Sequence, residues 1–116
     1  MLDIVKHIKV GDKEYPMAFT LNVMEAIQEK YGSLDAWTDI IDPEEGDPAF
    51  KDIKWVFAEF INEGIDIENE EKGEKRDFVT TKQVGRIITA IGIDGATFEL
   101  ANIMSQSMGE VEEKND

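Results

Sequence analysis

The sequence predicts a mostly helical α+β domain, in which an N-terminal β-hairpin packs on a bundle of about four to five helices. Two observations predict this class. β-Branched and polar residues alternate around a Gly11-Asp12-Lys13 turn, and the segments after residue 20 repeat apolar residues with a helical period. A chain of 116 residues suits one domain, which we expect over residues 1–109, followed by an acidic tail over 110–116.

The hairpin is expected over residues 4–19, with its second strand returning from Glu14 to Phe19. Pro16 lies in this return strand, and it favours an edge position because proline cannot donate to a strand ladder. A lone hairpin is only marginally stable in water, so this one must pack against the helices.

Two helices are expected next, over about 21–31 and 34–41. Thr20 is the expected N-cap of the first helix, and Gly32 is its expected C-terminal stop. Ser33 is expected to cap the second. The apolar face of the first helix carries Met24, Ile27 and Tyr31, and that of the second carries Leu34, Trp37 and Ile41.

The strongest apolar stripe predicts a central core helix over about 48–63. Asp47 is its expected N-cap, Pro48 its first residue and Gly64 its stop. The stripe consists of Phe50, Ile53, Phe57, Phe60 and Ile61. Residues 66–77 are polar and heavily charged, which predicts an exposed, mobile loop.

Two further helices are expected over about 81–91 and 96–108, separated by an Ile93-Asp94-Gly95 turn. Thr80 or Thr81 is the expected cap of the first, Gly92 closes it, and Gly109 ends the second. A glycine inside a helix costs about 1 kcal/mol relative to alanine. Gly85 therefore favours close packing of another helix or of the hairpin at that point. The apolar faces are Val84, Ile87, Ile88 and Ile91 in the first helix, and Phe98, Ala101, Met104 and Met108 in the second, with Leu100 and Ile103 beside them.

The composition narrows the function classes. A formal net charge of −14 repels phosphate backbones and anionic membrane surfaces, so we expect no nucleic acid and no membrane as a partner. The chain has no cysteine, which excludes disulfides, thiolate nucleophiles and Cys-ligated zinc. The N-terminus lacks the apolar stretch of a signal peptide, and we expect a protein of the cytoplasm.

Three patterns bear on catalysis or metal binding. Glu59 and Glu63 are spaced to converge as an acid–base pair, but the same spacing suits the solvated face of an amphipathic helix. Asp66 begins an alternation of oxygen ligands like that of a calcium loop, but Glu71 stands where the loop requires glycine. His7 is the only histidine. We therefore predict no catalytic residue, no cofactor and no metal site.

Binding of another protein has better candidates. Trp55 falls off the main stripe of the central helix, and Trp37 lies on a short helix. Met104 and Met108 stand near the end of the last helix, where methionine can form an adaptable contact surface. Each of these four residues could instead fill the core. They are the candidate partner-binding residues of this sequence.

The order of elements resembles a known family. A charged hairpin with Gly-Asp-Lys at its turn leads into a helix that ends in Lys-Tyr-Gly-Ser-Leu at residues 30–34. A core helix ends in Ile-Asn-Glu-Gly at 61–64, and Thr-Thr-Lys-Gln-Val-Gly at 80–85 opens a further helix pair. Over nearly its whole length the chain is similar to the tail assembly chaperones of long-tailed bacteriophages and prophages, particularly those of Gram-positive hosts.

The resemblance implies a non-enzymatic helper. Such proteins coat the long, hydrophobic tape measure protein in the host bacterial cytoplasm, keep it soluble while the tail tube polymerises around it, and are absent from the mature virion. Partners implied are the tape measure protein, the tail tube protein and further copies of the chain. The residues leave two alternatives open: another small phage morphogenesis or virion protein of the tail completion type, and an acidic regulator that mimics nucleic acid.

The C-terminal tripeptide Glu113-Lys114-Asn115 bears on the same family. It can be encoded with a slippery A-AAA-AAY run, where a chaperone with a longer, frameshifted form needs one. A lysine in an acidic tail also yields this tripeptide by chance. An AAG codon for Lys114, or no overlapping downstream reading frame, would exclude the frameshift.

Overall fold

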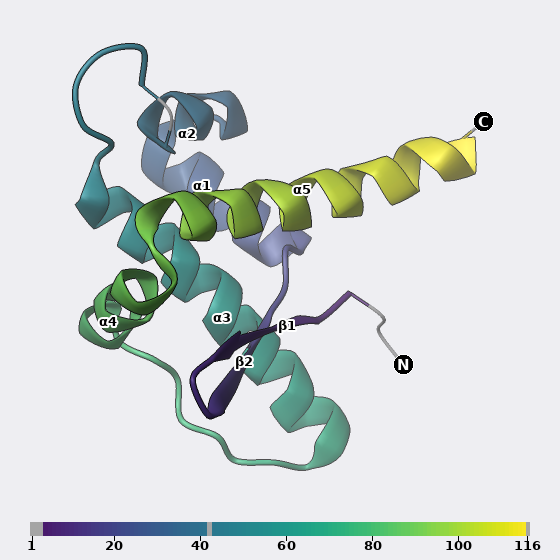
Figure 1. Ribbon diagram of the computed structural model, residues 1–116. Helices are drawn as coiled ribbons and strands as arrows, with labels where there is room; N and C mark the ends of the chain where they lie inside the picture. The colour runs from purple at the N-terminus through teal and green to yellow at the C-terminus, as the bar shows by residue number, and fades with distance from the viewer. Residues whose placement is uncertain (1–3, 42, 116) are drawn as a thin grey trace.

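The computed structural model describes residues 4–41 and 43–115 of this chain, with the side chains of Ile41 and of residues 108–115 left out of the description. Its architecture is a two-stranded antiparallel hairpin packed on five helices, which confirms the predicted α+β class (Figure 1). The elements are β1 (Lys6–Val10), β2 (Lys13–Met17), α1 (Leu21–Tyr31), α2 (Leu34–Ile41), α3 (Phe50–Lys72), α4 (Thr81–Ile91) and α5 (Ile93–Asn115). Helix α3 is central, because the hairpin and every other helix pack against it.

The hairpin rests on α3 through its backbone. The two strands pair in register from Lys6 opposite Met17 to Val10 opposite Lys13. Just after β2, the backbone N–H of Ala18 donates to the carbonyl oxygen of Phe60 in the middle of α3, at 3.0 Å. A side chain on the facing turn of the helix would hold the two backbones too far apart for this bond.

Gly64 supplies that close approach. A Cβ atom built on Gly64 would lie 2.7 Å from the carbonyl carbon of Pro16 and 2.8 Å from the amide nitrogen of Met17. Such distances leave no room for any side chain. The prediction that Gly64 ends the helix is therefore wrong: it is an interior residue of α3, kept free of a side chain by the hairpin that lies on it.

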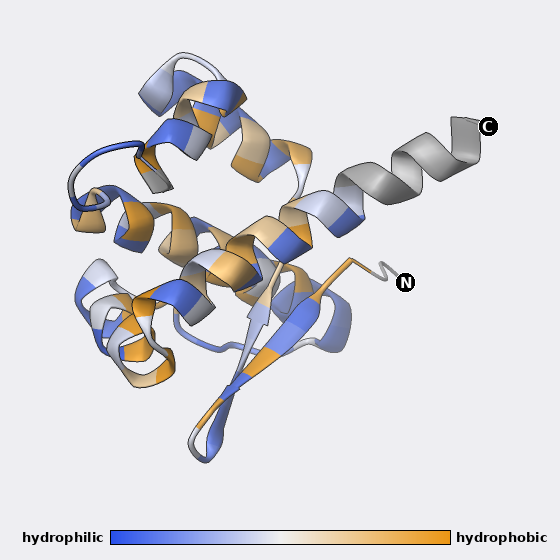
Figure 2. Ribbon diagram, turned by 45° about the horizontal axis from the view of Figure 1, so that its top comes forward, coloured by the Kyte–Doolittle hydropathy of each residue, from blue (hydrophilic) through white to orange (hydrophobic). Residues whose placement is uncertain are grey.

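Helix α3 differs from the predicted range 48–63 at both ends. It begins at Phe50 with Ala49 at the N-cap position, so neither Asp47 nor Pro48 has its expected role. It continues to Lys72 and ends at Gly73, which has a left-handed backbone conformation. The polar extension, blue in Figure 2, is held to the hairpin because Glu68 accepts a hydrogen bond from His7 at 2.6 Å and pairs with Lys72.

Two asparagines of α3 hold the segment that follows it. The side-chain amide of Asn69 accepts a hydrogen bond from the backbone N–H of Arg76 at 3.1 Å and donates one to its carbonyl oxygen at 3.0 Å. Asn62 bonds the N–H and carbonyl of Val79 in the same way, at 2.8 and 3.0 Å. Seven residues separate Asn62 from Asn69, which places them two turns apart on one side of the helix. The prediction of a mobile loop over 66–77 is thus wrong, because residues 66–72 continue α3 and residues 73–77, although exposed as predicted, are held through Arg76.

The helix caps agree only in part with expectation. Thr20 occupies the N-cap position of α1, but its hydroxyl donates to Oε2 of Glu63 and makes no cap hydrogen bond. Ser33 accepts from the backbone N–H of Ala36 at 3.1 Å, as predicted for the start of α2. Thr80 and Gln83 form a reciprocal capping box, which confirms Thr80 as the cap of α4.

Helices α4 and α5 meet at an elbow of one residue, Gly92, with an angle of 106° between α4 and residues 93–107 of α5. Gly92 donates to the carbonyl of Ile88 and accepts from the N–H of Ala96, so it ends one helix and begins the next. The expected turn over 93–95 and the expected start at residue 96 are therefore wrong. Helix α5 also runs past Gly109 to Asn115, through most of the segment expected to be a tail. Figure 1 shows α5 crossing over α3.

The core lies where α3 meets the other elements. Its largest fully buried side chains are Trp37, Phe57, Phe60, Met17, Ile27 and Ile53. The rings of Phe19 and Phe60 stack at 5.3 Å, beside the hydrogen bond that joins the hairpin to α3. Two residues expected on apolar faces, Phe50 and Phe98, are 54% and 65% exposed, because Phe50 lies in the first turn of α3 and Phe98 on the outer side of α5.

We expect Gly64→Ala to lower the free energy of unfolding by roughly 3 kcal/mol, because the new methyl group must push the hairpin backbone off α3. Chemical denaturation measures this. Gly85→Ala is the matched control: the nearest atom to its Cβ would be Cδ of the flexible Lys54 side chain at 3.2 Å. This variant should stay within about 1 kcal/mol of the parent, in the stabilising direction. Equal effects of the two changes would contradict the assigned role of Gly64.

The double variant Asn62→Ala/Asn69→Ala should release residues 73–80 while leaving the helices intact, because it removes four hydrogen bonds to that segment. Hydrogen exchange at the Arg76 and Val79 amides should rise roughly tenfold or more, and trypsin should cut faster after Lys75 and Arg76. Asn102→Ala, at an exposed position of α5, is the control and should change neither readout.

Candidate partner-binding surface

The predicted partner-binding residues occupy different environments. Trp37 is fully buried and packs near Tyr31, with 6.3 Å between the ring centroids. Its indole N–H has no hydrogen-bond partner among the described residues. Trp37 is therefore a core residue, and the expectation that it offers a contact surface is not supported. The reason is that α2 lies against α1 and α3 and buries its apolar side.

Trp55 is half-buried at the border of the core. Its ring meets Tyr31 edge-on at 5.9 Å, and the Lys30 ammonium group lies 4.4 Å from its centroid. Tyr31 in turn donates to Asp52 at 2.8 Å, and burial together with this hydrogen bond raises the pKa of Tyr31 well above its usual value. These contacts leave only part of the Trp55 ring accessible to a partner.

The two methionines do not form one described surface. Met104 is half-buried and packs against the core from α5. Met108 lies beyond the side chains that the structure describes. Of the four predicted residues, Trp37 is therefore buried, Trp55 and Met104 are half-buried, and the side chain of Met108 lies outside the description.

Among the side chains that the structure describes, four large apolar ones are exposed, and none of them was predicted to bind a partner. Their exposed fractions are 78% for Leu21, 54% for Phe50, 56% for Phe78 and 65% for Phe98. Three of them, Leu21, Phe50 and Phe98, were expected inside helical segments, and periodicity alone cannot tell which side of a helix another element will cover. The one available signal is their position, since Leu21 and Phe50 start helices and Phe78 precedes one.

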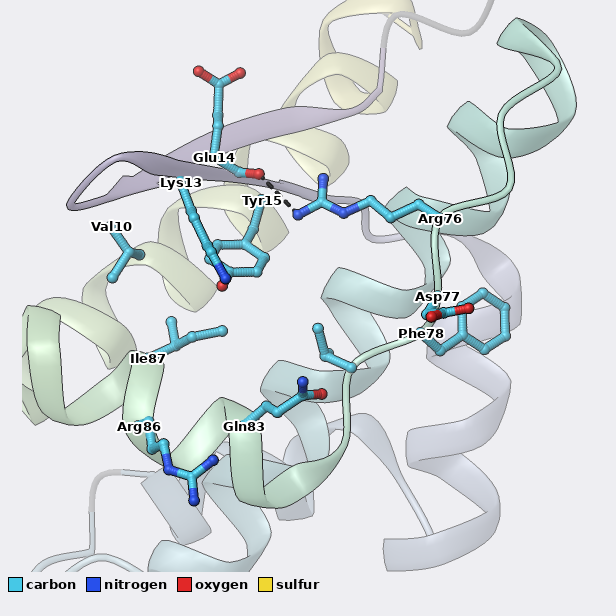
Figure 3. Close-up of a pocket in the computed structure, with 11 residues that line it drawn as sticks. Val10, Lys13, Glu14, Tyr15, Arg76, Asp77, Phe78, Gln83, Arg86 and Ile87 are labelled. Carbon is cyan, nitrogen blue, oxygen red and sulfur yellow. Dashed lines mark hydrogen bonds between the residues drawn. The ribbon is translucent and has the colours of Figure 1, made fainter.

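A hollow of about 760 Å³ lies between the hairpin, the anchored 73–80 segment and α4 (Figure 3). Tyr15 and Lys13 reach into it from β2, and Ile87 and Gln83 face it from α4. Arg76 closes one side, where its guanidinium donates to the carbonyl of Glu14 at 3.0 Å and lies 5.2 Å from the Tyr15 ring. This arginine satisfies an outer carbonyl of β2 and so occupies part of the strand edge.

A smaller, mostly apolar groove of about 390 Å³ lies on the other side of α4. Its residues are Phe50, Ile53 and Lys54 from α3, Gly85, Ile88 and Thr89 from α4, and Gly92 and Ile93 from the elbow. Beyond the elbow, a shallower hollow of about 480 Å³ includes Pro48, Asp94 and the exposed Phe98. Phe50 and Phe98 therefore flank the region where α3 begins and α4 turns into α5.

The Glu59–Glu63 pair lines a separate hollow, together with Asp66 and Phe78. Glu63 accepts hydrogen bonds from Thr20 and from Asn22, the latter at 3.0 Å, and so ties the start of α1 to α3. Burial and the neighbouring charge of Glu63 raise the pKa of Glu59, which Lys30 partly offsets. The geometry supports a structural role for Glu63, and no nucleophile lines this hollow.

The remaining chemical candidates form local contacts. His7 bonds Glu68, and although burial alone would raise the pKa of Glu68, the hydrogen bonds from His7 and Lys72 hold it below its usual value. Within the described ranges, no three His, Asp or Glu side chains are grouped so that they could hold a metal ion. Among the described helices, none alone is long and apolar enough to cross a membrane, and α4 passes that test only jointly with residues 93–107, across the 106° elbow.

Comparison with protein-family models, with curated proteins and with solved structures found no match to this chain.

Glu59→Gln should raise the midpoint of thermal unfolding at pH 7. The pKa of Glu59 is higher in the folded protein than in the unfolded chain, so its ionised form opposes folding above that pKa. Protonation relieves this cost as the pH falls through the raised pKa, and the difference between variant and parent should shrink there. Thermal melts across pH 4–8 measure it, with Glu25→Gln on α1 as the control. A difference that grows on acidification would contradict the argument.

Proposed function

We propose that this protein is a phage tail assembly chaperone that binds the tape measure protein and keeps it soluble while the tail tube polymerises. The observation that carries the proposal is the set of four large apolar side chains exposed on an acidic protein, at Leu21, Phe50, Phe78 and Phe98. The resemblance of residues 30–34, 61–64 and 80–85 to that family is the reason for proposing the tape measure protein as the partner.

The negative net charge and the exposed apolar side chains both suit a chaperone for an elongated apolar partner. A net charge of −14 keeps copies of the protein soluble at the high concentration that coating a long chain requires. Phe50 and Phe78 lie beside hollows on different sides of α3, so one copy can contact more than one segment of the partner. Apolar residues that insert into such hollows are typical of helix-in-groove recognition.

The proposed setting follows from the same role. The protein acts in the host bacterial cytoplasm, before the tail is complete, and leaves before the virion matures. Its partners are the tape measure protein and, at the growing end, the tail tube protein, with further copies of the chain along the tape measure.

Co-expression with the tape measure protein of the same genome tests the proposal. The tape measure protein should be mostly insoluble alone and soluble with the chaperone. A Leu21→Ser/Phe50→Ser/Phe78→Ser/Phe98→Ser variant should keep the parental fold, since these side chains are 54–78% exposed, and should lose most of the solubilising effect. Fractionation with quantitative blotting measures the soluble share.

Two results would contradict the proposal. One is a tape measure protein whose solubility does not depend on this chain. The other is stoichiometric presence of the chain in purified virions, which mass spectrometry detects and which would favour a tail completion component. An upstream tail tube gene and a very long downstream reading frame are the expected gene neighbours.

A further inference from the structure

Phe78 is an exposed aromatic residue on a backbone that is held in place. Its side chain lies outside the core, with 56% of the residue exposed. Close to it on either side, Arg76 and Val79 each exchange two backbone hydrogen bonds with an asparagine side chain of α3, at 2.8–3.1 Å. The position of the Phe78 ring is thus fixed before any partner arrives. An aromatic side chain presented in this way binds without the entropy cost of ordering a loop.

The hollow beside Phe78 is lined by three carboxylates of α3. Glu59, Glu63 and Asp66 are four and three residues apart, so they share one side of the helix. Figure 3 shows the Phe78 ring on the other side of its segment from Tyr15. The volume of the hollow, about 160 Å³, is several times the roughly 30 Å³ share of one water molecule, which leaves room for a charged group.

Two of the three carboxylates are available to a cation. Glu63 already accepts hydrogen bonds from two side chains at the start of α1. Within the described part of the chain, neither Glu59 nor Asp66 makes a hydrogen bond or an ion pair. Burial and the charge of Glu63 raise the pKa of Glu59, and Lys30 offsets this only in part. A cation in the hollow would therefore relieve a repulsion that remains in the folded chain.

The charges around the hollow are negative in sum. The elements that meet there are α1, residues 59–70 of α3 and residues 74–82, and together they contain nine acids and four bases. Two of the four bases have contacts of their own, because the Lys30 ammonium group lies 4.4 Å from the Trp55 ring centroid and Arg76 donates to a carbonyl of β2. The other two are Lys75 and Lys82. The local charge thus has the same sign as the net charge of −14, and both favour a basic partner.

We propose that Phe78 and this hollow form a docking surface for a basic amphipathic helix, which lays an apolar side chain on the Phe78 ring and places an arginine beside Glu59 and Asp66. A guanidinium group also lies favourably on an aromatic face. The inference deepens the proposed function and rests on it for the identity of the helix, which would be a segment of the tape measure protein.

Two synthetic peptides test the chemistry of the partner. Each is a fluorescein-labelled amphipathic helix of about 18 residues, long enough to be helical in water, with leucines along one face. The flanking positions are arginine in one peptide and citrulline in the other, which has nearly the same shape and no charge. In fluorescence anisotropy titrations at 150 mM salt, the arginine peptide should bind at least tenfold more tightly.

Variants of the aromatic contact locate the binding. Phe78→Ser should weaken the arginine peptide about tenfold. Phe50→Ser is the matched control and should change its affinity less than twofold, because Phe50 is 54% exposed but borders a groove that no carboxylate lines. Asn62→Ala/Asn69→Ala keeps the ring of Phe78 but releases its backbone, and it should weaken the peptide at least threefold.

Variants of the carboxylates separate local from net charge. Glu59→Gln/Asp66→Asn should weaken the arginine peptide about tenfold and leave the citrulline peptide unchanged. Glu44→Gln/Glu45→Gln removes two charges from an exposed loop and is the control. It should change the affinity less than twofold, because charges more than about 8 Å apart are largely screened at this ionic strength.

The inference is overturned if the citrulline peptide binds as well as the arginine peptide, or if any of these variants fails to differ from its control. It is also overturned if the amide resonances of Asp66 and Phe78 shift on concentrating the protein alone, since a second copy would then occupy the surface. Failure of the arginine peptide with intact tape measure capture refutes the surface and leaves the proposed function standing. Peptide binding that depends on Phe78, without tape measure capture, does the reverse.

Discussion

The structure depends on one backbone contact, in which residues 16–18 lie directly on α3 at Gly64. The hydrogen bond from Ala18 to Phe60 joins an exiting strand to a helical carbonyl, and the missing side chain of Gly64 makes room for it. A two-stranded hairpin has too little surface to be stable alone, and here it gains a third partner along the outer edge of β2. The contact lies inside α3, which continues beyond Gly64 into the polar sequence as far as Lys72.

That continuation organises the other half of the molecule. The added turns of α3 carry Asn69 and Glu68, which hold the returning segment and the first strand respectively. The returning segment then delivers Thr80 to the start of α4 at a defined place beside the hairpin. Helix α4 becomes a ridge between two hollows, one with the hairpin and one with the beginning of α3. The returning segment also carries Phe78, so the surface proposed to bind a basic helix depends on the anchoring of that segment.

Much of the fold could be predicted from the sequence because local signals carry it. The hairpin turn, the ranges 21–31, 34–41 and 81–91, and the caps at Ser33 and Thr80 rest on neighbouring residues. The candidate site was mostly missed. Trp37 and Trp55 are large and apolar, but their exposure depends on how α1 and α2 meet α3. Phe50 and Phe98 fit apolar stripes equally well, and only the packing left them outside.

The sequence by itself determined the class of fold, the order of its elements and the excess of negative charge. Periodicity and capping depend only on neighbouring residues, and net charge depends only on the composition of the chain. Tertiary structure alone decided the length of α3, the anchoring of residues 73–80 and the place of the apolar groove beside α4. Gly64 shows the physical reason. From its neighbours alone, a glycine before a polar run is read as the end of a helix. Here its role is instead to make room for Pro16 and Met17, which are distant in sequence but in contact with it in space.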